Sequence, residues 1–135
     1  MKKFYLTALL CCFGFGLSAA DVSIHLPPDT TGMIYDSPEI MPAFPGGHTA
    51  LDHYIRVHIK YPEEAKAQRL VGKVYVEFVV EKDGSITNVG IRMGKYPALN
   101  EEAMRVVRTM PHWEPGSNHG KVVRVRYTLP ITFAL

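Results

Sequence analysis

Hydrophobic and polar residues alternate with a period of two along residues 71–80. The apolar positions are Val74, Val76, Phe78 and Val80, and the polar positions between them are Lys73, Tyr75 and Glu77. Such alternation is typical of a strand with one buried face. Asp83-Gly84 then supplies the positive φ angles of a tight turn, and residues 86–93 place on one side Thr87, Val89, Ile91 and Met93. The pattern predicts a β-hairpin over residues 71–93, which needs another strand and a helix to cover its apolar face.

Apolar residues recur with a helical period on both sides of this hairpin. Residues 48–59 are predicted to form a helix whose apolar face contains Leu51, Ile55, His58 and Ile59. Tyr61-Pro62 is expected to end that helix and to begin a short one over residues 62–69. The clearest helix is predicted for residues 99–110, with an apolar face of Leu99, Ala103, Val106, Val107 and Met110. We expect Asn100 to cap it and Glu101 and Glu102 to lie in its first turn.

Residues 121–129 alternate again, which predicts a third strand. The expected buried side is Val123, Val125, Tyr127 and Leu129, and the expected solvent side is Val122, Arg124, Arg126 and Thr128. Pro130 follows, and because proline cannot donate a ladder hydrogen bond, this strand should lie at an edge or end there. The order α, α, β, β, α, β predicts an α+β fold with a ββαβ core, in which helices pack on one face of a three-stranded antiparallel sheet.

The N-terminal residues have the pattern of an export signal. Lys2-Lys3 precedes the apolar stretch 4–17, and Ser18-Ala19-Ala20 offers small residues for cleavage, so residues 1–20 are predicted to be a signal peptide. Retention of this segment as a membrane anchor is the alternative. Residues 21–47 contain five prolines and no helical period, which predicts an extended leader. Residues 48–135 are predicted to be the folded domain, and the protein is expected to be periplasmic.

Composition narrows the possible functions. Without Lys2 and Lys3 the chain has 13 basic and 13 acidic residues, so no nucleic-acid partner is expected. Both cysteines, Cys11 and Cys12, fall within the predicted signal, and the mature chain should therefore have no disulfide and no thiol chemistry.

The sequence gives only weak evidence for a catalytic or metal-binding site. His48, His53 and His58 are five residues apart, and on a helix this spacing points them in different directions. Glu63-Glu64 and Glu101-Glu102 are adjacent pairs near expected helix N-termini, where acids are stabilising for structural reasons. We therefore expect no metal, no cofactor and no enzymatic activity.

Several of these residues, taken in order, resemble the C-terminal domain of TonB, the energy transducer of Gram-negative envelopes. The resemblance begins near Phe44-Pro45-Gly46-Gly47, a lead-in similar to that of Bacteroidetes members. Its other landmarks are Tyr61-Pro62 with Ala65, Gly72, the strand 74–80, Asp83-Gly84-Ser85-Ile86, Leu99 with Ala103, Trp113 with Pro115, and the stretch 126–133.

The resemblance implies a binding function. Family members bind the TonB box, a short extended peptide of outer-membrane TonB-dependent transporters, by adding it as a strand beside their last strand. An unpaired strand edge offers N–H and C=O groups that suit this mode. The expected docking strand is Val122, Val123, Arg124, Val125, Arg126, Tyr127 and Thr128, and outward-facing Arg124 and Arg126 are expected to tune which peptides dock.

Two further interpretations stay open. Full-length family members are membrane-anchored and work with the ExbB–ExbD motor, whereas this anchor looks cleavable and the leader is short. Energy transduction with ExbB–ExbD is therefore expected only if the N-terminal segment is retained. Alternatively, the protein is a structural or adaptor component of the envelope, which pairs with itself as a homodimer, or with another envelope protein, through its last strand.

Overall fold

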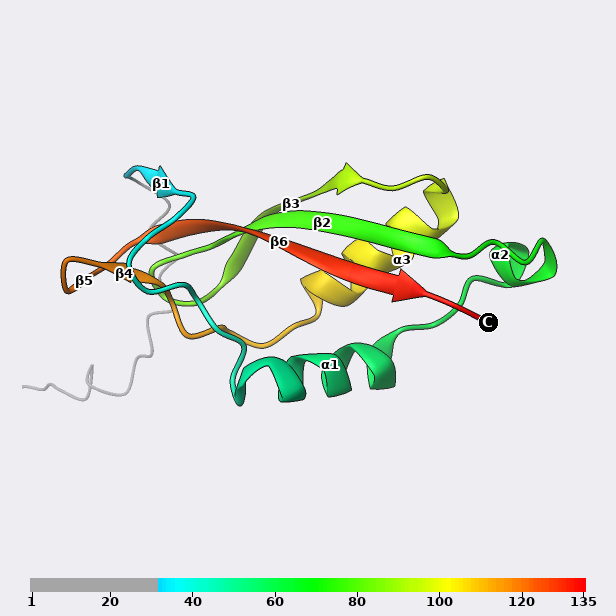
Figure 1. The fold of residues 1–135 in the computed structure, drawn as a ribbon, viewed down its shortest axis with the longest axis horizontal. Coiled ribbons are helices and arrows are strands. Elements are labelled where there is room, and N and C mark those ends of the chain that lie inside the picture. The colour runs from blue at the N-terminus through cyan, green and yellow to red at the C-terminus, as the bar shows by residue number, and fades with distance from the viewer. Residues whose placement is uncertain (1–31) are drawn as a thin grey trace, which may run out of the picture.

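A four-stranded sheet runs the length of the molecule (Figure 1). The computed structural model describes residues 32–135. The sheet order is β1-β6-β2-β3, with bounds β1 Ile34–Tyr35, β6 Arg124–Phe133, β2 Gly72–Val80 and β3 Ile86–Met93. A separate two-stranded hairpin comprises β4 Ser117–Asn118 and β5 Lys121–Val122. The helices are α1 Gly47–His58, α2 Glu63–Ala67 and α3 Pro97–Arg108, and α1 and α3 lie on the same side of the sheet.

The predicted α+β class and the central hairpin are confirmed. β2 pairs with β3 in antiparallel fashion around the Asp83-Gly84 turn. One detail is wrong: Met93 is 64% exposed instead of sharing the buried side of β3. The pairing shifts register twice: between Tyr75 and Val76, opposite residues 91–93, and between Glu77 and Val79, opposite Asn88, whose φ is +53°. Each irregularity changes which alternate residues of β3 face inwards, and the residues packed on the core are Ile86, Val89 and Ile91.

The sheet contains a fourth strand that was not predicted. Ile34 and Tyr35 of the proline-rich segment pair in parallel with Arg124 and Val125. The same segment then contacts the loop after α3, where Ile40 pairs with Ser117 and Ala43 with Glu114. A strand of two residues carries no detectable period, and therefore only the pairing with β6 reveals it.

The last strand begins and ends later than predicted. It was expected over residues 121–129, but β6 spans Arg124–Phe133, and Lys121–Val122 belongs to the β4-β5 hairpin. The turn of that hairpin places His119 and Gly120 at positive φ, which redirects the chain before β6. Pro130 lies inside β6, in a stretch that forms the edge of the sheet, as one of the two predicted alternatives required.

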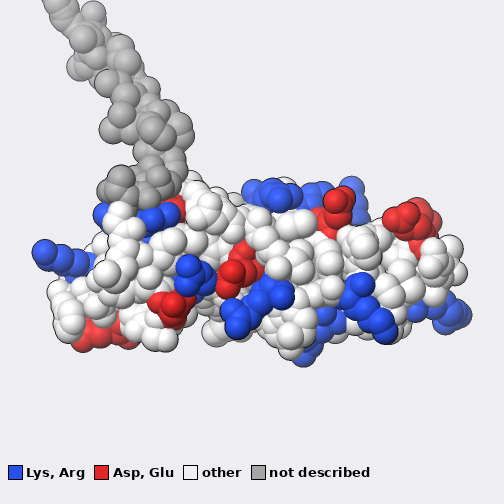
Figure 2. All heavy atoms as spheres, turned by 90° about the horizontal axis from the view of Figure 1, so that it is seen from above, with Lys and Arg blue, Asp and Glu red and all other residues white. Residues whose placement is uncertain are grey.

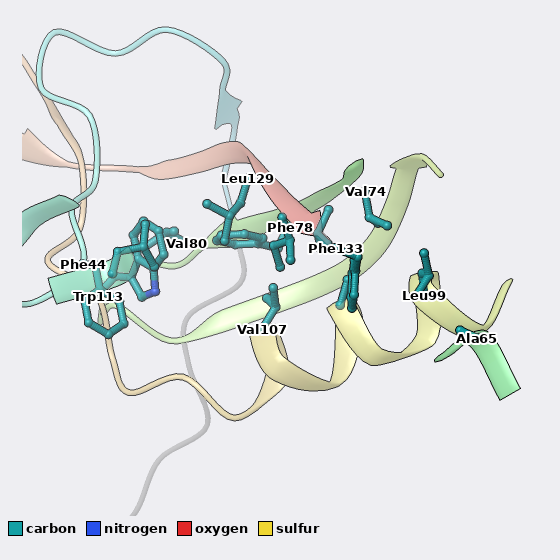
Figure 3. Packing of buried hydrophobic residues seen from close by; sticks show 14 residues of the cluster. Phe44, Ala65, Val74, Phe78, Val80, Leu99, Val107, Trp113, Leu129 and Phe133 are labelled. Atoms are coloured by element: carbon teal, nitrogen blue, oxygen red, sulfur yellow. The ribbon is translucent and has the colours of Figure 1, made fainter. Parts of the chain in front are cut away.

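The core lies between the sheet and the helices (Figure 3). Phe78 of β2 is fully buried, and Trp113, the only tryptophan of the chain, is 3% exposed. The indole of Trp113 meets the Phe78, Phe44 and Tyr127 rings at centroid distances of 5.4, 5.8 and 5.0 Å. This aromatic cluster joins the proline-rich segment, the hairpin and β6 into one core.

Helix α3 starts two residues earlier than predicted. Tyr96 is its N-cap and Pro97 its first residue, so Asn100 lies within the helix and does not cap it. Proline suits this first position because its fixed φ is helical and the missing N–H would have had no partner there. Glu101 and Glu102 consequently lie beyond the first turn. The prediction for α1 holds to within one residue, but His58 is exposed and stacks on Tyr54 at 3.9 Å between ring centroids.

Glu102 ties the end of α1 to α3. Its carboxylate accepts hydrogen bonds from the Lys60 backbone N–H at 2.6 Å and from Arg105 at 2.8 and 2.7 Å, and Arg105 also donates to the His58 carbonyl. Burial opposes ionisation of Glu102, but the Arg105 hydrogen bonds, the Lys60 N–H and the nearby positive charges outweigh it and lower its pKa below the usual 4.5.

We predict an acid-sensitive attachment of α1. Because the pKa of Glu102 is lowered in the folded state, the stability it contributes is present above the ordinary glutamate value and is lost as pH falls through the folded pKa. Amide hydrogen exchange at Lys60 should accelerate over that pH range. Glu102→Gln should remove the pH dependence, and Glu101→Gln, at the exposed neighbouring position, should leave it unchanged. If amide exchange at Lys60 had the same pH dependence in Glu102→Gln as in the parent protein, this role of Glu102 would be contradicted.

No helix within residues 32–135 is long and apolar enough to cross a membrane. The predicted signal peptide, with Cys11 and Cys12, lies outside the described residues, and so does the part of the predicted leader before residue 32.

Candidate peptide-binding edge

The second half of β6 forms an open edge of the sheet. β6 pairs with β2 along its length, from Val125 opposite Val80 to Phe133 opposite Gly72. On its other side, β1 pairs only with Arg124 and Val125. Within residues 32–135 no strand covers β6 from Arg126 onwards. An uncovered edge presents a row of backbone donors and acceptors that an extended peptide can pair with.

Pro130 shows which backbone groups face this edge. The ladder between β6 and β2 passes through Pro130, opposite Tyr75, without a shift in register. Since proline has no N–H, an unbroken ladder indicates that its nitrogen points away from β2. In an antiparallel strand, alternate residues direct both N–H and C=O to the same side. Residues 126, 128 and 132 therefore offer donors and acceptors at the open edge, and Pro130 offers only an acceptor.

The predicted docking residues fall into three environments. Val122 lies in β5 opposite Ser117, and Val123 lies between β5 and β6. Two residues are covered by β1, namely Arg124 and Val125. Three lie on the open edge, namely Arg126, Tyr127 and Thr128. The open edge continues to Phe133, beyond the predicted stretch.

Arg124 does not face solvent, contrary to the prediction. It is 8% exposed and forms a bidentate ion pair with fully buried Glu81, at 2.8 Å from Nε and 3.2 Å from Nη2. Its Nη1 donates to the Gly32 carbonyl at 3.0 Å, and Thr87 donates its hydroxyl hydrogen bond to the same carboxylate. The alternating pattern correctly predicted that Arg124 lies on the sheet face opposite the core. At this position, however, the proline-rich segment packs over that face and buries the side chain. It cannot contact a docked peptide.

Arg126 marks the start of the open edge. Its guanidinium donates to Asp36 at 2.5 Å, so the residue that follows β1 is held beside β6. The sheet face opposite the helices is called the outer face here. Around Arg126 this face has a hollow lined by Asp36, Met41, Glu77, Arg92, Arg126, Tyr127 and Thr128. Its charges balance, because two acids face two bases. Figure 2, seen from above Figure 1, likewise shows basic and acidic side chains interspersed, which does not suggest a polyanion-binding surface.

The open edge of β6 is a surface suited to binding an extended chain. Within residues 32–135 no three His, Cys, Asp or Glu side chains come together as metal ligands. The chemical capacity of the open edge is main-chain hydrogen bonding. The sequence pattern did not predict that β1 covers Arg124 and Val125. The only sign of β1 in the sequence is the apolar pair Ile34-Tyr35 within a stretch of prolines.

These features define a class: a small α+β domain with an open sheet edge suited to an extended peptide. The family model that matches is described as Gram-negative bacterial TonB protein C-terminal, and it covers residues 57–135. This chain belongs to that family, whose members are generally involved in TonB-dependent transport. A search of the curated proteins found no match.

Solved structures of TonB C-terminal domains are similar to this chain. A solution structure of the Helicobacter pylori domain has a TM-score of 0.50 and 23% identity, and the match covers 64% of this chain and 78% of that one. A second H. pylori structure has a TM-score of 0.48 and 21% identity, and the match covers 64% of this chain and 90% of that one. A Pseudomonas aeruginosa domain has a TM-score of 0.45 and 26% identity, and the match covers 56% of this chain and 77% of that one. The first likeness supports the predicted fold.

Proposed function

We propose that this protein is a periplasmic module that binds the TonB box of outer-membrane TonB-dependent transporters by β-strand addition, and so supports energy-coupled uptake. The observation that carries the proposal is the open edge of β6 after Arg126, in a chain of the TonB C-terminal family. Main-chain pairing supplies affinity with little demand on sequence, which suits a module that serves several transporters. The docking stretch we propose is shifted towards the C-terminus: it runs from Arg126 to Phe133, whereas the predicted one runs from Val122 to Thr128.

Coupling to ExbB–ExbD requires the N-terminal segment to remain in the inner membrane. Membrane fractionation of the native protein, with N-terminal sequencing, separates the two states. A protein that begins near Asp21 in the soluble fraction would bind transporters without transmitting force from a membrane motor.

Thr128→Pro tests the edge directly. Thr128 lies opposite Glu77, and its N–H is one of those directed to the open edge, so proline there removes a donor and adds a ring without breaking the ladder to β2. We expect affinity for a transporter-box peptide, measured by calorimetry, to fall about tenfold or more, because 1.4 kcal/mol corresponds to a factor of ten.

Thr128→Ala is the matched control, because it removes the same side chain and keeps the N–H. We expect its affinity to stay within about twofold of the parent protein. Circular dichroism must show both variants folded. Equal peptide affinity in the two variants would mean that the peptide does not add to this edge.

The adaptor alternative uses the same open edge, because two copies can pair there as two strands. Sedimentation without peptide distinguishes the two functions. A concentration-dependent dimer that Thr128→Pro abolishes, together with no binding of any box peptide, would favour the adaptor.

A further inference from the structure

A small notch lies beside the open edge on the helix side of the sheet. It measures about 50 Å³ and is lined by Pro42, Ala43, Phe44, Gly47, His48, Leu51, Trp113 and Tyr127. Three parts of the chain form it: the segment before α1, the first turns of α1, and the Trp113–Tyr127 aromatic pair. Pairing of Ala43 with Glu114 holds the first of these in place, at 2.9 and 2.7 Å.

Tyr127 connects the notch to the edge. Its side chain points to the helix layer, where it meets the Phe78 and Trp113 rings at centroid distances of 5.6 and 5.0 Å. Residues directly opposite each other on paired strands project to the same face, about 5 Å apart. A strand added beside β6 would therefore direct the side chain opposite Tyr127 towards the notch. Its two sequence neighbours would point to the outer face, near Arg126.

The lining of the notch determines which side chain it can hold. Five of its residues are apolar, and no acid, lysine or arginine lines it. An apolar cavity of about 150 Å³ can hold a benzene ring, so a space of about 50 Å³ suits a few carbon atoms rather than an aromatic ring. A buried carboxylate or ammonium would find no Lys, Arg, Asp or Glu in the lining to pair with.

We infer that the notch anchors one small aliphatic side chain, of valine or leucine size, of the bound peptide strand. This inference rests on the proposed function. The pairing of β1 with Arg124 and Val125 closes the edge just before Arg126, and the Asp36–Arg126 ion pair holds the chain there. The anchor is consequently among the last two paired residues at one end of the peptide: the C-terminal end if the peptide is antiparallel to β6, and the N-terminal end if it is parallel.

A substitution scan of a bound transporter-box peptide tests the anchor. Each peptide position is changed in turn to Gly, Ala, Val, Leu, Phe and Glu, and affinity for the purified protein is measured by calorimetry. We expect one position, near one end of the paired segment, where Val or Leu binds about tenfold more tightly than Gly. At that position Phe and Glu should bind at least about tenfold more weakly than Val.

Ala43→Leu links the preference to the notch, because the larger side chain fills it. The advantage of Val over Gly should disappear, and the Gly peptide should keep its affinity within about twofold. Ala67→Leu, at an exposed position of α2, is the matched control and should keep the full advantage. His48→Ala widens the notch from its exposed side and should shift the preference from Val towards Leu or Phe. It serves as the second test should Ala43→Leu fail to fold.

The outcomes separate this inference from the proposed function. Peptides that bind through β6 with no size-selective position, or with a preference that Ala43→Leu and His48→Ala both leave unchanged, would overturn the anchor and leave strand addition intact. Failure of every box peptide to bind would overturn the proposed function and the anchor with it.

Discussion

Arg124→Ala is expected to lower the free energy of unfolding by about 3–5 kcal/mol, the range for removing one partner of a buried ion pair. Glu81 is fully buried, and Arg124 supplies both charged hydrogen bonds to its carboxylate. Without the guanidinium, the buried carboxylate loses both of these hydrogen bonds, and a buried charge without its partner is strongly destabilising. The variant also loses the Arg124 hydrogen bond to the Gly32 carbonyl, so β1 should detach and the amides of Ile34 and Tyr35 should exchange faster.

Urea unfolding measures the effect, and Arg92→Ala is its matched control. Arg92 pairs with Glu77 at 3.3 Å, but its side chain is 63% exposed, and exposed pairs contribute at most about 1 kcal/mol. A loss below about 1 kcal/mol in Arg124→Ala would show that the buried Arg124–Glu81 pair contributes no more to stability than an exposed pair does. Arg124→Glu should destabilise the protein more than Arg124→Ala does, because it places two carboxylates together. The alternating sequence pattern alone would have predicted a surface substitution with little effect on stability.

Gly84→Ala is the second substitution with a large expected effect, about 2–5 kcal/mol of stability. Gly84 has φ +89°, where a side chain costs about 1–2 kcal/mol. An added Cβ would also overlap the backbone carbonyl oxygen of Trp113, and forced overpacking adds about 1–3 kcal/mol. The two segments cannot easily separate, because the Trp113 N–H donates to the Gly84 carbonyl at 2.8 Å.

Gly90→Ala controls for the general effect of replacing a strand glycine. An added Cβ at Gly90 meets nothing within 4 Å, so its unfolding free energy should change by about 0.5 kcal/mol or less. Thermal or urea unfolding of the two variants gives the comparison. Similar stabilities would mean that the hairpin turn can move away from Trp113, and the aromatic cluster beneath β6 would then be less rigid than the contacts indicate.

The segment before α1 contributes to both sides of the candidate site. On the outer face, Asp36 pairs with Arg126 and limits where the open edge begins. On the helix side, Phe44 packs against Trp113 and lines the notch below Tyr127. A truncation that starts at the helix would therefore change the binding edge as well as the length of the protein. Peptide-binding studies need residues 32–46 present.

Local chemistry determined much of the fold. The alternation of Val74, Val76 and Phe78, with Asp83-Gly84 after them, specified the hairpin, because a half-buried strand and a tight turn each have a short-range signature. The helical periods specified α1 and α3 to within two residues, and Pro130 indicated an edge strand. The ordered landmarks then identified the TonB C-terminal family.

Tertiary structure alone decided which part of the edge is free and which charges are buried. β1 is too short to have a period, and its partner is some 90 residues away in sequence, so no local pattern reports that Arg124 and Val125 are covered. The same contact converts Arg124 from an expected surface residue into half of a buried ion pair with Glu81. The notch exists because Phe44, Leu51 and Tyr127, from three separate segments, meet around a space that none of them defines alone.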